Sequence, residues 1–96
     1  DGARTAFETA LALDPSFIPA RVNLSEVLRL KQDEAAAERV LRDGLRLSGA
    51  SAALHHALGL ALVRQKRLTE ALGELKEAAS REPGSGRYAY VYAVAT

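Results

Sequence analysis

The sequence predicts an all-α protein, a superhelix of antiparallel helix hairpins, and three observations support this fold class. Alanine, leucine, arginine and glutamate, which are strong helix formers, dominate the 96 residues, and apolar residues recur at steps of three and four. No segment alternates apolar and polar residues between turn residues, as a half-buried strand would. Finally, Ala3, Ala37 and Ala71 recur at a constant 34-residue step, which is typical of stacked repeats.

Turn residues divide the chain into six expected helices. The first runs from Gly2 to Leu13 and stops at Asp14-Pro15, because proline disfavours helical backbone in the residue before it. Ser16 is the expected N-cap of the second helix. Pro19 is tolerated in the first turn of this helix, which should end near Lys31.

The third helix is expected over Glu34 to Leu47, with Asp33 as its cap and Ser48-Gly49 as its end, because glycine suits a left-handed C-cap. Short connections make consecutive helices pack antiparallel. The last three helices are expected over Ser51–Arg64, Leu68–Arg81 and Gly86–Thr96.

The 34-residue period keeps small and large residues in register, which a generic alanine-rich bundle would not do. Small residues let two helix backbones approach closely, and larger ones fill the space beside them. We therefore expect the three alanines of the period to have like surroundings. The expected packing residues are Ala3, Phe7, Leu24, Ser25, Ala37, Leu41, Leu58, Gly59, Ala71, Leu75 and Pro83.

This register resembles the tetratricopeptide repeat, whose signature is a Trp, then Leu-Gly, an aromatic, an Ala, an aromatic and a closing Pro. Leucines replace most of the aromatics, while Arg21 and His55 stand where the family prefers Trp. The resemblance implies one domain over 1–96. Its parts are the second helix of a partial repeat (1–17), two repeats (18–51 and 52–85) and the first helix of a partial repeat (86–96).

The resemblance also implies that the first helix of each repeat lines a concave groove, suited to an extended peptide or a partner helix. A merely solvated face is the alternative for any single residue. Some family members bind a peptide's terminal carboxylate with a set of lysine, arginine and asparagine residues in this groove. Here only Asn23 and Arg87 stand near places of that set; the others are replaced by Val22, Glu26, Ala57 and Val91, and Glu26 would also repel a carboxylate. The implied groove residues are Val22, Asn23, Glu26, Arg29, Leu30, His56, Leu60, Val63, Arg64, Arg87, Tyr90 and Val94.

Both ends of the chain stop within a repeat, and residues 88–95 are apolar all round. An uncapped stack leaves apolar surface in water. We therefore expect either a piece of a longer array or a last helix that another copy covers. Two alternatives to partner binding stay open: self-association through this helix, and an auxiliary domain that positions a substrate for a larger enzyme.

Catalysis, metal and cofactor binding have little support in the sequence. Cysteine is absent, and no nucleophile elbow or phosphate-binding glycine loop occurs. Adjacent helical residues point about 100° apart, so His55 and His56 cannot face one ion. The acids and bases of 64–81 are expected to pair on a solvated surface. We therefore expect a non-enzymatic protein without metal or cofactor.

Charge and hydropathy limit the partners further. The net charge of +1, without a basic stripe, argues against nucleic-acid binding. No apolar run approaches the roughly 20 residues of a membrane span. The compartment is undecided: the bias toward arginine and alanine weakly suggests a bacterial source, where cytoplasm and periplasm both fit. The expected partner is a protein or peptide of unknown identity.

Overall fold

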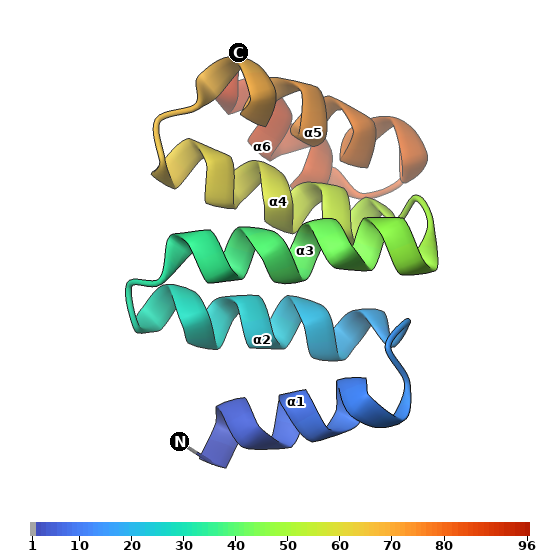
Figure 1. Cartoon of the computed structure of the whole chain (residues 1–96). Coiled ribbons are helices and arrows are strands. Elements are labelled where there is room, and N and C mark those ends of the chain that lie inside the picture. Colours follow the sequence, from blue (N-terminus) through green and yellow to red (C-terminus); the bar gives the residue numbers. More distant parts are fainter. Residues whose placement is uncertain (1) are drawn as a thin grey trace. The chain divides into compact units, whose positions relative to one another are not determined.

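A computed structural model describes residues 2–96, which form six α-helices and no strand (Figure 1). The all-helical prediction is therefore confirmed. Asp1, the first residue of the expected range 1–17, lies outside the described residues. The helices are α1 Gly2–Leu13, α2 Ile18–Leu30, α3 Glu34–Ser48, α4 Ala52–Arg64, α5 Leu68–Arg81 and α6 Gly86–Ala95.

The helices belong to two compact units that divide between Gly49 and Ala50. The first unit contains α1, α2 and α3, and the second contains α4, α5 and α6. The arrangement of the whole chain as one superhelix stays a prediction.

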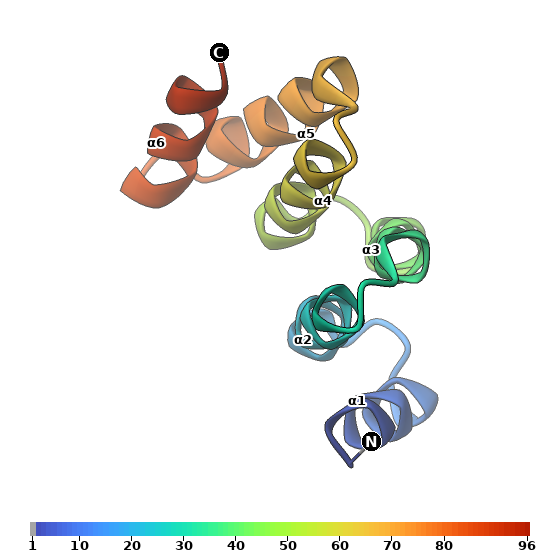
Figure 2. The ribbon, with the colours of Figure 1, turned by 90° about the vertical axis from the view of Figure 1, so that its left-hand side faces the viewer.

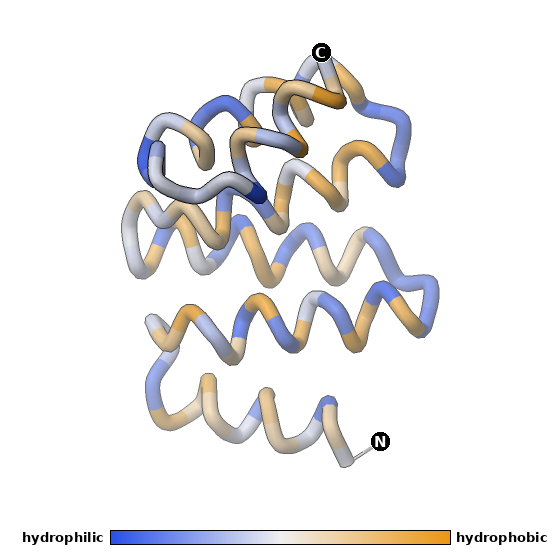
Figure 3. The backbone as a smooth tube through the Cα atoms, turned by 180° about the vertical axis from the view of Figure 1, so that it is seen from behind, coloured by the Kyte–Doolittle hydropathy of each residue, from blue (hydrophilic) through white to orange (hydrophobic). Residues whose placement is uncertain are grey.

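In the first unit, α2 packs against both α1 and α3 (Figure 2). Apolar and polar residues alternate along α2 and α3 (Figure 3), so each helix can turn one apolar side inward. The interior is built from one leucine-rich face of α2 and the small residues of α3. The buried cluster is Leu24, Leu28, Ala36 and Ala37, with Phe7, Leu11 and Val40 packed against it.

In the second unit, α5 packs against both α4 and α6. Ala52 of α4, Ala78 of α5 and Tyr88 of α6 form one buried cluster, so all three helices share an interior. The largest fully buried side chains of this unit are Leu54, Leu58, Leu62 and Leu75.

The turn between α2 and α3 is reproduced 34 residues later between α4 and α5. Gln32 and Lys66 have positive φ angles of 62° and 61°. The Asp33 N–H donates to the Leu28 carbonyl, and the Arg67 N–H to the Leu62 carbonyl, both at 2.9 Å. Together with the bonds from the Gln32 N–H to the Arg29 carbonyl (2.8 Å) and from the Lys66 N–H to the Val63 carbonyl (2.9 Å), these form the Schellman motif. The two turns therefore share one backbone geometry.

Replacing Lys66 by glycine is expected to raise the free energy of unfolding. A left-handed backbone costs an L-residue about 1–2 kcal/mol. The greater entropy that glycine loses on folding offsets about 0.5–1 kcal/mol of this, so we expect a gain of up to about 1 kcal/mol in urea unfolding. Lys76→Gly, inside α5, is the control and should lower stability by about 1 kcal/mol. A loss of stability in Lys66→Gly would contradict the turn geometry.

The helix ends agree with most of the expected caps. The Asp33 carboxylate accepts from the Ala36 N–H at 3.1 Å, and Gly49 ends α3 with a φ of 78° that glycine adopts without strain. The Ser16 cap prediction is wrong, because Phe17 is the N-cap of α2 and makes no side-chain cap bond. The Ser16 hydroxyl instead donates to Asp14 Oδ1 at 2.8 Å, so it serves the turn before the helix.

Candidate binding surfaces

The groove residues predicted on α2 lie on a largely open face of the first unit. Asn23, Glu26 and Leu30 are exposed, and Leu30 has 72% of its surface accessible. Val22 and Arg29 are partly buried. Arg29 donates to Glu26 Oε2 from both Nη2 (2.8 Å) and Nε (3.0 Å). This face therefore offers an apolar side chain beside a neutralised ion pair.

The groove residues predicted in the second unit divide between α4 and α6. On α4, Leu60 is partly buried, while Val63 and Arg64 are exposed. On α6, Arg87, Tyr90 and Val94 are exposed; Tyr90 and Val94 have 69% and 68% of their surface accessible. The last three are spaced by three and four residues, so they lie along one face of α6. We call these three residues the α6 face.

His56 is the exception among the predicted groove residues, because it lies in the interior. Only 6% of its surface is accessible, and its ring stacks on Tyr88 with centroids 4.5 Å apart. The Arg87 guanidinium lies 5.2 Å from the centroid of the Tyr88 ring. No sequence signal showed that Tyr88 of α6 would cover a residue of α4.

The environment of His56 favours its neutral form. Its Nδ1 is buried without a hydrogen-bond partner. Burial lowers the pKa of His56 below its usual 6.5, and the positive charge of Arg87 lowers it further. Protonation of His56 would place a cation in an apolar site beside another cation.

The stability of the second unit is expected to fall in mild acid because of His56. The folded pKa is lowered, so the unfolded state binds more protons below about pH 6.5, and stability decreases as the pH falls through the folded pKa. Tyrosine fluorescence during urea unfolding, at pH 7.5 and 5.5, measures the effect, since all three tyrosines lie in α6. His56→Phe should reduce the decrease.

His55 supplies the matched control for this measurement. Its Nδ1 lies 2.7 Å from Glu74 Oε1, which joins α4 to α5, and its side chain is 14% exposed. His55 is therefore a half-buried structural residue at the position where the resembling family prefers Trp. His55→Gln, which retains a side-chain donor, removes the other histidine of the chain and leaves His56 in place, so a decrease that persists in this variant is assigned to His56. An unchanged pH dependence in His56→Phe would contradict the assignment to His56.

Most of the predicted packing residues are buried in the two hairpins. Ala37 and Ala71 are 0% and 1% exposed, and each lies on the second helix of its hairpin. Ala3 differs from them, because it is exposed and no helix precedes α1 within residues 2–96. The expectation of like surroundings therefore holds for two of the three alanines. Leu24, Ser25, Leu41, Leu58, Gly59 and Leu75 are buried, Phe7 is partly buried and Pro83 is exposed.

Gly59 lies where α4 and α5 are packed tightly. A Cβ atom added to Gly59 would lie 2.6 Å from Leu75 Cδ2 and 3.3 Å from the Leu75 backbone nitrogen. A side chain at this position therefore cannot fit unless Leu75 moves. This contact is the reason that a small residue faces a large one within the second hairpin.

Arg21 is a structural residue that the sequence analysis missed. It is 7% exposed; its Nε donates to the Pro15 carbonyl at 2.9 Å and its Nη1 to the Val40 carbonyl at 3.0 Å. The guanidinium thus ties the α1–α2 loop to α3. The only sequence signal at this position was that Arg21 stands where the tetratricopeptide family prefers Trp.

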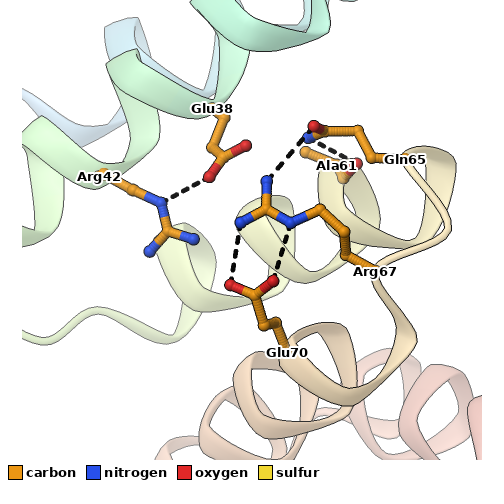
Figure 4. Close-up of polar contacts among 6 residues, drawn as sticks. All are labelled: Glu38, Arg42, Ala61, Gln65, Arg67 and Glu70. Carbon is orange, nitrogen blue, oxygen red and sulfur yellow. Dashed lines mark hydrogen bonds and ion pairs between the residues drawn. The ribbon is translucent and has the colours of Figure 1, made fainter.

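Charged side chains pair on the surface, as the sequence predicted for 64–81. Arg67 donates to both Glu70 oxygens, at 2.8 and 2.9 Å, and contacts Gln65, while in the first unit Arg42 donates to Glu38 at 2.7 Å (Figure 4). Arg81 pairs with Glu77 at 2.9 Å. Exposed pairs of this kind contribute about 0–1 kcal/mol each. They are therefore weak surface interactions.

Two further findings concern the range 2–96. No three or more His, Cys, Asp or Glu residues of this range are placed to hold a metal ion. Each helix in the same range is too short or too polar to cross a bilayer. Comparison with known proteins gives no family model that matches the chain and no curated protein that matches it.

Proposed function

We propose that this chain is a helical-repeat scaffold of the tetratricopeptide type, which binds a protein or peptide partner without catalysing a reaction. The observation that carries the proposal is the duplicated turn: Gln32 and Lys66 share a positive φ although neither is glycine. Equal backbone geometry at equal sequence spacing supports two copies of one hairpin. Stacked hairpins of this kind act through extended binding surfaces.

The α6 face and the exposed part of α4 would suit a partner that combines apolar and acidic residues. Tyr90 and Val94 expose apolar surface, and Arg87 adds a positive charge. Aromatic and arginine side chains dominate the binding energy of many interfaces. A peptide with apolar residues at three- and four-residue steps and an acidic residue nearby would complement this surface.

The serine hydroxyls support a non-catalytic role, because several of them serve the backbone. Ser51 and Ser85 accept from the N–H groups of Leu54 and Tyr88 at helix starts. Ser25 donates to the Val22 carbonyl at 2.7 Å. Such local bonds are the usual structural use of serine at caps and in helices.

Selection from a phage-displayed peptide library, followed by titration of the selected peptides, tests the proposal. Tyr90→Glu/Val94→Glu is expected to weaken binding more than tenfold, because it places charge where the peptide needs apolar contact. Gly73→Glu/Ser80→Glu carries the same charge change on exposed positions of α5 and should bind like the wild type. Failure to select any peptide, or equal loss in both double variants, would contradict the proposal.

A further inference from the structure

Two adjacent histidines of α4 lie beside oppositely charged groups of the two helices that pack with it. His55 Nδ1 lies 2.7 Å from Glu74 Oε1 of α5. His56 stacks on Tyr88 of α6, and the Arg87 guanidinium lies 5.2 Å from the centroid of the same tyrosine ring. A proton on His55 would therefore meet a carboxylate, whereas a proton on His56 would place a second cation near Arg87.

The other charged groups of the second unit are either paired or exposed. Besides three tyrosine phenols, α6 carries Arg87 alone as a charged group. The acidic residues of α5 are engaged in the pairs Glu70–Arg67, Glu74–His55 and Glu77–Arg81. The remaining charged residues of 50–96 are exposed, namely Arg64, Lys66, Lys76 and Glu82. Since His56 Nδ1 is buried without a hydrogen-bond partner, a proton placed there would lack an acceptor.

The packing of α4 on α5 does not involve the His56 stack. The fully buried leucines of this unit lie on these two helices, and Leu75 of α5 lies against Gly59 of α4. A proton on His55 would strengthen its bond to Glu74, because hydrogen bonds between opposite charges are stronger than neutral ones. Acid therefore acts against the contact of α4 with α6 and not against the contact of α4 with α5.

We propose that the stack of His56 on Tyr88 is a proton-sensitive joint, which opens in mild acid and releases α6 while α4 and α5 stay packed together. Tyr88 is the α6 side chain that is buried in the interior shared by the three helices. Loss of its stack on His56 therefore acts directly on the position of α6.

The direction and size of the effect follow from one proton. Burial and the charge of Arg87 lower the pKa of His56 in the closed form, whereas the open form exposes the ring to water, where its pKa is about 6.5. Opening therefore binds a proton, and the ratio of open to closed molecules increases as the pH falls through about 6.5. Between pH 7.5 and 5.5, one proton increases this ratio by up to about tenfold.

The joint also divides the surface to which we assign partner binding. The α6 face lies on one side of it, and Val63 and Arg64 of α4 lie on the other. Opening would separate these two parts of the surface. This consequence rests on the proposed function, whereas the opening itself needs no partner and is tested without one.

Amide hydrogen exchange of the 96-residue chain, followed by NMR and expressed as protection factors at each pH, tests the proposal. A helix of ten residues is marginal in water, so a released α6 exposes its amides. Protection in α6 should decrease by up to about tenfold between pH 7.5 and 5.5. Amides near Leu58 of α4 should stay more protected than those of α6. Urea should accelerate exchange more at Leu58, because unfolding the whole unit exposes more surface than releasing one helix.

Three variants assign the acid effect to the joint. His56→Phe keeps a ring against Tyr88 but cannot be protonated, so it should remove most of the effect on α6. Arg87→Gln removes the second cation from an exposed position and leaves the interior unchanged, so the effect should become smaller. Lys76→Gln removes the same charge from an exposed position of α5 and should behave like the wild type.

Three results would overturn the proposal. One is equal protection and equal urea dependence in α4, α5 and α6, which would show that the unit opens as a whole. Another is protection in α6 that is the same at both pH values. The third is an acid effect that His56→Phe leaves unchanged or, where that variant does not fold, that Arg87→Gln leaves unchanged. Because none of these measurements uses a peptide, this proposal and the proposed function fail separately.

Discussion

Truncating Leu75 to alanine is expected to lower the free energy of unfolding by about 2–5 kcal/mol, the range for large-to-small changes in a core. Leu75 is 1% exposed and lies against Gly59 of α4. The loss combines the transfer of the removed atoms with the cavity that a rigid helix pair cannot close. Urea unfolding followed by tyrosine fluorescence measures it in the second unit.

A substitution of Gly59 tests the same contact, because the change in unfolding free energy caused by Gly59→Ala should depend on whether Leu75 is present. In the wild type, Gly59→Ala gains about 1 kcal/mol of helix propensity but crowds Leu75, which costs about 1–3 kcal/mol. In the Leu75→Ala background the two crowding side-chain atoms are absent and only the backbone nitrogen of residue 75 stays close, at 3.3 Å, so the same change should be less destabilising than in the wild type. The double-mutant cycle should therefore give a coupling energy of about 1–3 kcal/mol between the two positions.

Leu68 provides the control for the leucine truncation. It lies on the same helix and is 59% exposed, so Leu68→Ala should change stability by about 0.5 kcal/mol or less. Equal losses for Leu68→Ala and Leu75→Ala, or additive effects of Gly59→Ala and Leu75→Ala, would show that the close approach of α4 and α5 does not stabilise the unit.

The positions of the helices could be predicted from local signals in the sequence. Cap and turn residues act on the backbone within a few residues of themselves; the examples here are Pro15, Asp33 and Gly49. The helix ends therefore lie within a residue or two of the expected places. The leucines at three- and four-residue steps indicated the buried faces for the same reason. The Ser16 cap prediction failed because α2 begins one residue later than expected, with Phe17 as its N-cap, while the Ser16 hydroxyl donates to Asp14.

The residues that sequence reasoning missed depend on contacts between distant segments. His56 is buried because Tyr88, 32 positions later, stacks on it. Arg21 is buried because carbonyls of Pro15 and Val40 accept its N–H groups. The spacing of apolar residues within one helix does not indicate that Tyr88 contacts His56 or that the carbonyls of Pro15 and Val40 accept from Arg21. The positive φ of Lys66 was missed for a different reason, since the expected signal at such a position is glycine.

Replacing Arg21 by methionine is expected to lower the free energy of unfolding of the first unit by about 2–4 kcal/mol. Hydrogen bonds from charged groups contribute about 1.5–3 kcal/mol each, and Arg21 makes two of them to backbone carbonyls. Methionine keeps an unbranched apolar stem but leaves both carbonyls without this donor. Methionine packs well but replaces neither hydrogen bond, so it recovers only part of the loss.

Circular dichroism and tyrosine fluorescence together locate this effect. Both report the second unit, but only circular dichroism reports α1, α2 and α3, since every tyrosine lies in α6. Arg21→Met should shift the unfolding curve seen by circular dichroism more than the curve seen by fluorescence. Arg39→Met, at an exposed position of α3, removes the same charge and should change stability by about 0.5 kcal/mol or less. If Arg21→Met is as stable as Arg39→Met, the guanidinium does not hold the α1–α2 loop against α3.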